Sequence, residues 1–368
     1  MNGLQAKKVV LIGTLLFSLI ALWLAIDPIK YITSENNPNA IWEAWTDYDE
    51  DLKEIIDSNV IQRLKKVDQS GPPHYFGLRL PAFSRFEHSI GVLALLRKAG
   101  ASKLEQIAGL LHDASHTAFS HLGDYLFEDN IARQEEKNYQ DSIHLSYLRS
   151  HAGPLLKRLN IKIEDVDPDN GKCTMLEQPL PDMCADRIQY NIHTGLILKF
   201  ISQKEARSIL EDLQFKDGKW FFTDPILAKT FATLSVRFTK EFWGSKWNVI
   251  MNLYLSSAVK RAIKIGLITR DDVFSTDDAM LDKLLHTEDK FVVHYLRLCN
   301  NPDLVDEYAS GETQKFTPKF RGINPLVKVG GRLVRLTEID AEFKALFEEG
   351  QRFCKEGFNI PVMPSTNS

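Results

Sequence analysis

The sequence predicts an all-α domain with minor short β-hairpin elements, preceded by one N-terminal transmembrane helix. Apolar residues recur at helical spacing after residue 41, alternating strand patterns are few, and residues 9–26 form an uncharged apolar run. Of the 368 residues, 44% are hydrophobic and 26% are charged. This globular composition has ample apolar surface for a core and excludes wholesale disorder.

The overall charge and the cysteines exclude further classes. The 45 lysine and arginine residues against 49 aspartate and glutamate residues leave a net charge of −4, so no nucleic-acid partner is indicated. The four cysteines, Cys173, Cys184, Cys299 and Cys354, form no C-x-x-C pair. This spacing argues against a disulfide scaffold or a thiolate zinc site.

The N-terminal run of eighteen uncharged residues at 9–26 would make a helix of about 27 Å, just enough to span a bilayer core. The alternatives are a cleaved signal peptide and a buried helix. A signal peptide fits less well because the run exceeds the usual apolar region of roughly 7–15 residues, and Trp23 stands where a small residue is needed.

The charges that flank this run predict its topology. Lys7 and Lys8 predict that residues 1–8 stay in the cytoplasm and that the rest of the chain is exported. The expected product is a single-pass membrane protein or, alternatively, an exported protein after signal cleavage. Residues 27–40 are polar and read as a linker. A helical domain is expected over 41–325 and a C-terminal extension over 326–368.

Within the domain, the apolar spacing predicts helices at 104–111 and 202–213. The acidic, turn-rich stretch 163–171 is interpreted as a loop. Two short hairpin elements are expected, one at 220–223 after Asp217-Gly218 and one at 326–336 around Gly330-Gly331.

Eight of the ten histidines fall between His74 and His193, and four motifs carry the chemistry. The motifs are RFEHS at 85–89, LLHD at 110–113 followed by His116 and His121, YQDSIH at 139–144, and ADRIQY at 185–190. Histidine and aspartate together form a mixed N/O ligand set suited to Fe, Mn, Co or Ni as well as Zn. An open position on such a metal can activate water toward phosphorus.

Each motif alone has an ordinary explanation. His112 could be a hydrogen-bonded core histidine, Asp113 a helix cap, and Asp186 with Arg187 a surface ion pair. The order His, His-Asp, Asp, with helix-length gaps between the motifs, favours a shared site instead.

These motifs resemble those of the HD-domain phosphohydrolase superfamily, within it the branch of deoxynucleotide triphosphohydrolases that includes bacterial dGTPases and eukaryotic SAM-and-HD-domain enzymes. Residues 61–91 resemble the branch's Q-R-L…Q…R-F-x-H-S run, residues 110–121 its L-x-H-D-x-x-H-x-x-F-S-H run, and residues 185–190 its D-[KR]-x-x-Y helix. The resemblance covers 59–195 and implies the helical HD-domain fold.

The resemblance also implies a role for each matching residue. The implied metal ligands are His88, His112, Asp113 and Asp186. The implied catalytic histidines are His116, near the phosphates, and His121, which would protonate the leaving oxygen. The residues at the substrate would be Gln69, Arg85, Gln140, Asp141, Arg187 and Tyr190.

Two positions depart from the family pattern. Gln140 stands where the family has a catalytic histidine, and an amide cannot shuttle a proton as imidazole does. His144, one helical turn further on, could substitute as a catalytic residue. Thr194 stands where an aspartate is expected.

The expected activity is therefore metal-dependent hydrolysis of a nucleotide or related phosphate ester, with a dNTP triphosphohydrolase as one form. The cofactor would be Fe, Mn, Co, Ni or Zn, alone or with Mg. The alternatives are a phosphomonoesterase or 5′-nucleotidase, a cyclic-nucleotide phosphodiesterase, and a non-catalytic nucleotide-binding membrane protein. The expected partners are this substrate and, through residues 9–26, the membrane; a homo-oligomer is compatible with the sequence.

Overall fold

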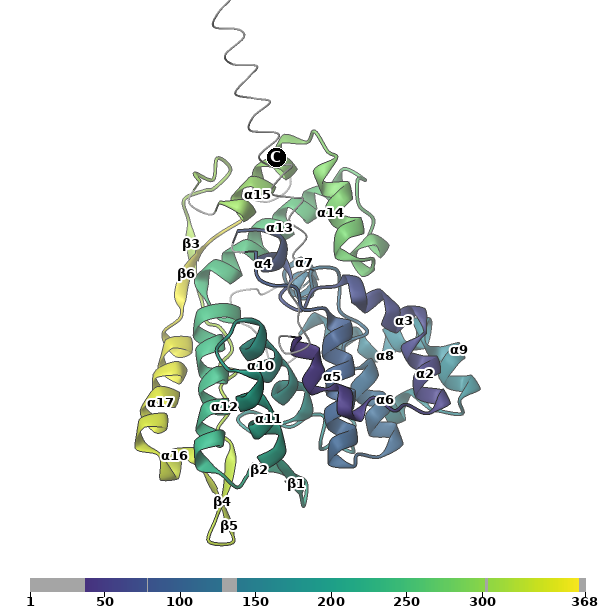
Figure 1. Ribbon diagram of the computed structural model, residues 1–368. Helices are drawn as coiled ribbons and strands as arrows, with labels where there is room; N and C mark the ends of the chain where they lie inside the picture. The colour runs from purple at the N-terminus through teal and green to yellow at the C-terminus, as the bar shows by residue number, and fades with distance from the viewer. Residues whose placement is uncertain (1–36, 78, 128–137, 302–303, 364–368) are drawn as a thin grey trace, which may run out of the picture. The chain divides into compact units, whose positions relative to one another are not determined.

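The computed structural model describes residues 37–77, 79–127, 138–301 and 304–363. A compact unit spans Ile41–Ser368, and within it helices predominate over two small sheets (Figure 1). The helices in the first part of the chain are α2 (Glu50–Ile56), α3 (Asn59–Gln62), α4 (Pro72–Tyr75), α5 (Arg85–Ala99), α6 (Lys103–Leu111), α7 (Leu122–Phe127), α8 (Tyr139–His151) and α9 (Gly153–Arg158).

The remaining helices are α10 (Ala185–Ile197), α11 (Gln203–Asp212), α12 (Pro225–Phe238), α13 (Lys246–Lys264), α14 (Asp277–Leu285), α15 (Lys290–Asn300), α16 (Leu336–Ile339) and α17 (Ala341–Glu356). Short 3-10 segments are η3 (Pro38–Ile41), η4 (Glu43–Trp45), η5 (Arg63–Lys66), η6 (Ile163–Val166) and η8 (Asp271–Phe274), and η7 (Thr239–Trp243) is a π-helix. Helices α6 and α11 confirm the helices predicted at 104–111 and 202–213. The stretch 163–171, predicted as a loop, begins with the 3-10 turn η6, and only the residues after Val166 form a loop.

The strands are β1 (Gln214–Lys216), β2 (Lys219–Phe222), β3 (Thr313–Phe316), β4 (Leu326–Val329), β5 (Arg332–Arg335) and β6 (Phe358–Pro361). The two predicted hairpins, β1–β2 and β4–β5, are present. Asp217, Gly218, Gly330 and Gly331 all have positive φ at the two turns, a conformation that Asp-Gly and Gly-Gly pairs favour.

The tertiary fold joins the two hairpins. Strand β2 pairs in parallel with β4, which makes one four-stranded sheet in the order β1-β2-β4-β5, while β3 and β6 form a separate antiparallel pair. Helix α17 packs against α12. Residues 326–363 therefore pack within the same unit as the helices that precede them.

The prediction of a transmembrane helix needs correction. A membrane-spanning helix needs about 20 consecutive, mostly apolar residues. Helix α13 has 19 residues but includes Lys246, Lys260 and Arg261, and in the described part of the chain no helix is both long and apolar enough to cross a bilayer. The predicted single-pass membrane location is therefore wrong for the described residues. The run 9–26 lies outside them.

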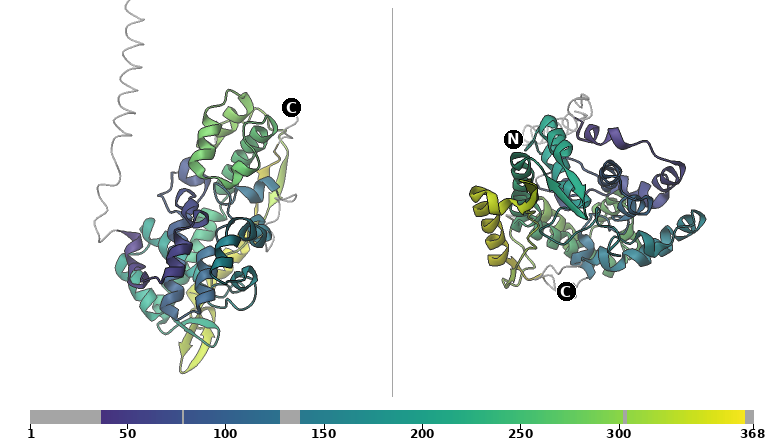
Figure 2. Two further views of the ribbon diagram at one scale, coloured as in Figure 1. Left: turned by 90° about the vertical axis from the view of Figure 1, so that its right-hand side faces the viewer. Right: turned by 90° about the horizontal axis from the view of Figure 1, so that it is seen from below.

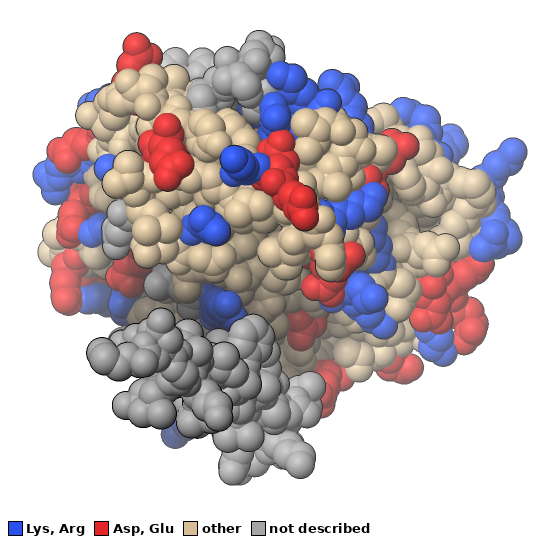
Figure 3. Space-filling view, turned by 90° about the horizontal axis from the view of Figure 1, so that it is seen from above, with Lys and Arg blue, Asp and Glu red and all other residues tan. Residues whose placement is uncertain are grey.

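Two hydrophobic clusters make up most of the core. One is built on α5, α6, α10 and α12, and the other on α13, α14 and α15, which Figures 1 and 2 show grouped at one end of the unit. The loop 112–121 joins the clusters, since Ala114 packs in the first and Ala118 and Phe119 pack in the second. On the face drawn in Figure 3, acidic and basic side chains are interspersed.

Candidate metal centre and active site

Helix α5 positions two of the predicted site residues, Arg85 and His88. The helix begins at a capping box, in which the Ser84 hydroxyl accepts the Glu87 N–H at 3.1 Å and the Glu87 carboxylate accepts the Ser84 N–H at 2.8 Å. Arg85 and His88 lie three residues apart in the first turn, so they share one face. Both are buried, with 1% and 0% of their surface exposed.

The loop that follows α6 brings His112 to the same place. His112 ends the helix, and its Nδ1 donates a hydrogen bond to the Gly109 carbonyl at 2.7 Å. Further along the loop, Ser120 accepts a hydrogen bond from Arg85 Nε at 2.7 Å and donates one to the Asp68 carbonyl. These contacts tie the loop to α5.

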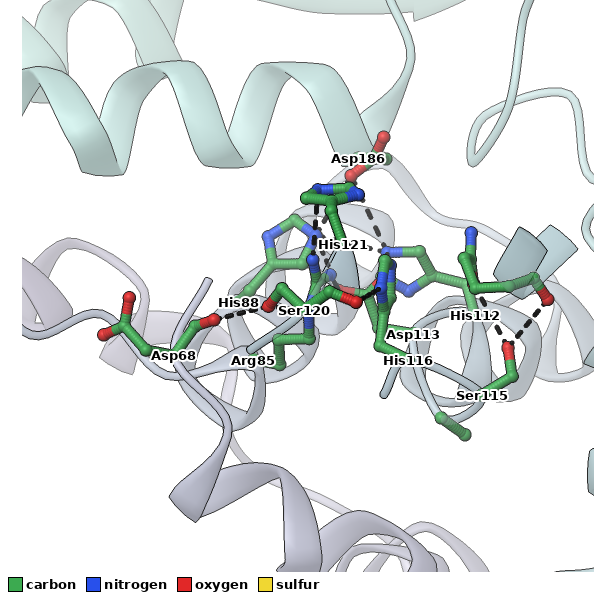
Figure 4. Close-up of polar contacts among 12 residues, drawn as sticks. Asp68, Arg85, His88, His112, Asp113, Ser115, His116, Ser120, His121 and Asp186 are labelled. Atoms are coloured by element: carbon green, nitrogen blue, oxygen red, sulfur yellow. Dashed lines mark hydrogen bonds and ion pairs between the residues drawn. The ribbon is translucent and has the colours of Figure 1, made fainter. Parts of the chain in front are cut away.

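Helix α10 supplies the third group, Asp186, from its first turn, where the helix dipole favours a carboxylate. Asp186 Oδ1 lies 3.0 Å from His88 Nε2 and 3.6 Å from His112 Nε2, and the two Nε2 atoms are 3.2 Å apart (Figure 4). Three segments that are distant in sequence therefore converge on one point.

These distances fit a metal ion. With bonds of about 2.1 Å, neighbouring ligand atoms stand about 3.0 Å apart at octahedral angles and about 3.4 Å apart at tetrahedral angles. Both rings donate their Nδ1 proton to an oxygen, His88 to Gln189 Oε1 at 2.5 Å and His112 to Gly109. The Nε2 atoms are thus the ring nitrogens that face a metal.

The electrostatics of the cluster favour a cation. Burial lowers the pKa of His112, but the Asp113 and Asp186 carboxylates outweigh this effect and raise the pKa to about 9. Burial alone would raise the pKa of Asp186, yet hydrogen bonds and charges from His112 and His88 hold that pKa far below its ordinary value. The cluster thus attracts positive charge, and its residues fit a divalent ion.

Asp113, the fourth predicted ligand, lies beside this cluster. Its Oδ2 accepts a hydrogen bond from Arg85 at 2.5 Å and stands 3.6 Å from His88 Nε2. Its Oδ1 is 3.5 Å from His112 Nε2 and 3.2 Å from His116 Nε2. Burial, then the Arg85 charge, lowers the pKa of His116 to about 3, so His116 is neutral near pH 7.

His121 is the most exposed of the predicted catalytic histidines, with 41% of its side chain accessible. Its Nδ1 lies 3.4 Å from Asp124 Oδ2, and its Nε2 lies 3.4 Å from an Arg85 terminal nitrogen. Asp124 was not predicted as a site residue, although its spacing of three residues after His121 was a usable signal. Against the effect of burial, the hydrogen bond from His121 lowers the pKa of Asp124.

Helix α8 carries Gln140, Asp141 and His144. Ser115, which sequence reasoning missed, links two of them, because its hydroxyl donates to Gln140 Oε1 at 3.1 Å and lies 3.0 Å from His144 Nδ1. The Gln140 amide donates to Asp141. His144 Nε2 has no hydrogen-bond partner among the described residues, and burial, then His112, lowers the pKa of His144 to about 4. The ring is therefore neutral near pH 7.

Arg187 is anchored beside the cluster. It donates to the Gln178 carbonyl at 2.5 Å and pairs with Glu177 at 3.4 Å. Glu177 was not predicted; burial, then the Asp186 charge, raises its pKa to about 7. Glu177, Cys184 and Asp186 also offer ligand atoms within 4.8 Å of one another. However, the Arg187 guanidinium already pairs with Glu177, and burial raises the pKa of the Cys184 thiol, which disfavours the thiolate that a metal needs. The set of His88, His112 and Asp186 therefore fits an ion better.

All the predicted site residues except His88, which is fully buried, line one cavity of about 830 Å³. Two polar atoms at this cavity, the Tyr190 hydroxyl and Gln69 Oε1, are buried without a hydrogen-bond partner among the described residues. Thr194 lines the cavity as well. The structure thus brings residues from 69 to 194 around one space, which a small-molecule ligand could occupy.

Comparisons with known proteins found relatives of this chain. No family model matches the chain. The uncharacterized protein YdhJ of Bacillus subtilis is 30% identical over 314 residues, which cover 85% of this chain and 94% of YdhJ. The metal-dependent phosphohydrolase cns2 of Cordyceps militaris is 26% identical over 235 residues, covering 62% of this chain and 66% of cns2.

A solved structure shares the fold. The crystal structure of a phosphohydrolase from Bacteroides thetaiotaomicron superposes with a TM-score of 0.61 at 15% sequence identity. The match covers 80% of this chain and 92% of that one.

Proposed function

We propose that this chain, which belongs to the same family as Bacillus subtilis YdhJ, is a metal-dependent phosphohydrolase of the HD superfamily that hydrolyses a phosphate ester of a nucleotide. One observation carries the proposal. Two imidazole Nε2 atoms, from His88 and His112, converge with the Asp186 carboxylate beside a cavity of about 830 Å³.

The proposed metal ligands are His88, His112, Asp186 and the adjacent Asp113. The ion would be divalent Fe, Mn, Co, Ni or Zn, alone or with Mg. Such an ion supplies Lewis-acid activation of water and of phosphoryl oxygens when it is bound.

Arginine side chains orient the phosphate in this proposal. Arg85 uses one terminal nitrogen on Asp113 and its Nε on Ser120, which leaves the other terminal nitrogen, beside His121, to face a phosphate oxygen. Arg187 is held in place by Glu177 and contributes charge at the cavity wall.

The three predicted catalytic histidines, His116, His121 and His144, have different capacities for proton transfer. His121 is accessible and oriented by Asp124, so it is assigned to protonate the leaving oxygen. His116 and His144 are neutral near pH 7, so neither supplies a proton there. The unpartnered Nε2 of His144 is therefore the better acceptor for a proton released from water.

The part of the substrate beyond the phosphate meets aromatic side chains. Tyr190, Phe242, Trp243 and Trp247 line the cavity, whose volume is ample for a nucleoside. The resemblance to the dGTPase branch favours a dNTP as the substrate.

The charges on the cavity wall favour a second candidate, a nucleoside monophosphate. When no metal ion is counted, carboxylates outnumber lysine and arginine side chains among the lining residues. The carboxylates are Asp113, Asp141, Asp167, Asp169, Glu177 and Asp186. The cations are Arg85, Arg187, Lys319 and Arg321. A triphosphate carries more negative charge than a phosphate monoester, so the lining carboxylates repel it more strongly.

A product assay with the purified, metal-supplemented protein tests both candidates. The panel contains dNTPs, nucleoside monophosphates, cyclic nucleotides and a sugar phosphate, and the assay separates phosphate from triphosphate. Triphosphate release identifies a dNTP triphosphohydrolase, whereas phosphate release from monophosphates identifies a nucleotidase. Turnover of the sugar phosphate alone would contradict the nucleotide proposal.

A further inference from the structure

Gln189 reaches a metal ligand from a neighbouring helix. It lies on α10, three residues after Asp186, and its Oε1 accepts a hydrogen bond from His88 Nδ1 at 2.5 Å. Both side chains are fully buried. An amide oxygen only accepts hydrogen bonds, so this contact places a proton of the His88 ring on Nδ1 and leaves Nε2 as the nitrogen that faces the metal site.

Gly91 opens the space that Gln189 fills. It lies on α5, three residues after His88, and a Cβ at this position would stand 2.3 Å from Gln189 Nε2, 2.8 Å from Cγ and 2.9 Å from Cδ. These separations are shorter than real Cβ contacts. Glycine inside a helix is unfavourable relative to alanine because of the backbone entropy it loses on folding. Its presence here therefore points to a packing requirement.

The two helices match each other at these positions. His88 and Gly91 on α5 face Asp186 and Gln189 on α10, and each pair has the spacing of three residues that puts its members on one helix face. The two ligands and the residues that support them thus form one contact between α5 and α10.

We propose that Gln189 is a positioning residue for the metal ligand His88, and that Gly91 is required because it leaves room for Gln189. The inference rests on the proposed metal centre and adds residues to it. Without the amide oxygen, the buried Nδ1–H of His88 loses its acceptor. The proton is then favoured on Nε2, where it donates a hydrogen bond to Asp186, and the lone pair that remains is on Nδ1, which faces position 189 and not the metal site.

The test compares the Mn²⁺ affinity of variants by calorimetric titration of the metal-free, full-length protein. Gln189→Met keeps the side-chain length without the acceptor, and we expect it to weaken Mn²⁺ binding by about 10–100-fold. Gln189→Glu restores an acceptor and should bind Mn²⁺ within about threefold of wild type. Nitrogen chemical shifts of His88 in the metal-free protein should report a proton on Nδ1 in wild type and its loss from Nδ1 in Gln189→Met.

A matched control lies on the same helix. Asn191 is also a fully buried amide, but its Nδ2 donates to the Arg187 carbonyl at 2.8 Å rather than to a ligand. Asn191→Leu should bind Mn²⁺ as wild type does, even if it lowers the melting temperature. Equal losses of affinity in Asn191→Leu and Gln189→Met would show a general packing effect and overturn the proposal.

A double-mutant cycle tests Gly91 independently of the Gln189→Met variant. Gly91→Ala should weaken Mn²⁺ binding in the wild-type background, because the new methyl group displaces Gln189. In a Gln189→Ala background the same change should have no further effect, since no side chain remains to be displaced. Additive losses would contradict the assigned role of Gly91.

The failure of this inference is distinguishable from the failure of the proposed function. If wild type binds none of Mn²⁺, Fe²⁺, Co²⁺, Ni²⁺ and Zn²⁺, the metal centre itself is wrong and the inference falls with it. If wild type binds Mn²⁺ and folded Gln189→Met binds it equally well, only the role of Gln189 is wrong.

Discussion

Asp277 Oδ1 accepts a hydrogen bond from the backbone N–H of Phe119 at 2.6 Å, across 158 positions of sequence. Its other oxygen accepts the N–H of Asp68 at 2.8 Å. Phe119 and Ser120 have φ of 56° and 59°, a region that residues other than glycine adopt only where their surroundings hold them. Helix α14 thus holds the loop from which Ser120 contacts Arg85.

Replacing Asp277 should therefore affect both stability and turnover. Asp277→Ala leaves two buried N–H groups without an acceptor, so we expect a loss of roughly 2–4 kcal/mol in the free energy of unfolding. The kcat should also fall, because Ser120 no longer orients Arg85. Urea unfolding and steady-state kinetics measure the two effects. The neighbouring Asp278 is exposed, and Asp278→Ala serves as the control. Equal stability of the two variants would show that the Asp277 contacts contribute nothing.

The metal centre predicts a specific result for Asp186. Asp186→Ala removes an anionic ligand whose side chain is 22% exposed, so the protein should fold but hold no metal. Turnover should fall by roughly 10³-fold, because Lewis-acid activation contributes several kcal/mol. Added metal should no longer raise the melting temperature. Metal content and thermal unfolding check this, with Asp182→Ala, four residues earlier, as the control. Full metal content in Asp186→Ala would refute the ligand assignment.

The assignment of the general acid predicts a different pattern for His121. His121→Ala should retain the metal and lose turnover by roughly 10²–10⁴-fold, since proton transfer to the leaving oxygen is removed. Asp124→Asn should lose less turnover, because it weakens the contact that orients the His121 ring but leaves the ring in place. Metal analysis with single-turnover kinetics distinguishes these effects, and His151→Ala on α8 is the control. A loss of metal from His121→Ala would make His121 a ligand instead.

Buried His193 predicts how stability depends on pH. Its Nδ1 accepts the Trp42 indole N–H at 3.3 Å, and burial, then the His88 charge, lowers the pKa of His193 from 6.5 to about 3. Between these values the unfolded chain binds a proton that the folded protein does not. Stability therefore falls as the pH falls below about 6.5, by up to about 1.4 kcal/mol per pH unit from this group.

The contribution of His193 is isolated by a difference. His193→Gln lacks the titration, and other groups that titrate in this window cancel when the two proteins are compared. The stability advantage of wild type over His193→Gln should shrink as the pH falls from 7.5 to 5, measured by urea unfolding at each pH. A constant difference across this range would show that His193 does not titrate as stated.

Local sequence features anticipated much of the fold and of the site. Asp217-Gly218 and Gly330-Gly331 predicted both hairpins, because turn conformations with positive φ depend on the residues of the turn itself. The motifs around His88, His112 and Asp186 marked residues that the structure brings within 3.6 Å of one another. The transmembrane helix was the clear error. Its support came from the apolar run and its flanking residues, and the described helices include none that could cross a bilayer.

The sequence by itself determined the chemical types at the site and the helices that present them, because side-chain spacing along a helix is a local property. Only the tertiary structure decided which groups support them. Gln189 meets His88 across 101 positions, and Asp277 meets Phe119 across 158. Such contacts follow from how helices pack and from which buried donor lacks an acceptor. Neither is encoded in the spacing of any one motif, so these supporting residues emerge only once the core has formed.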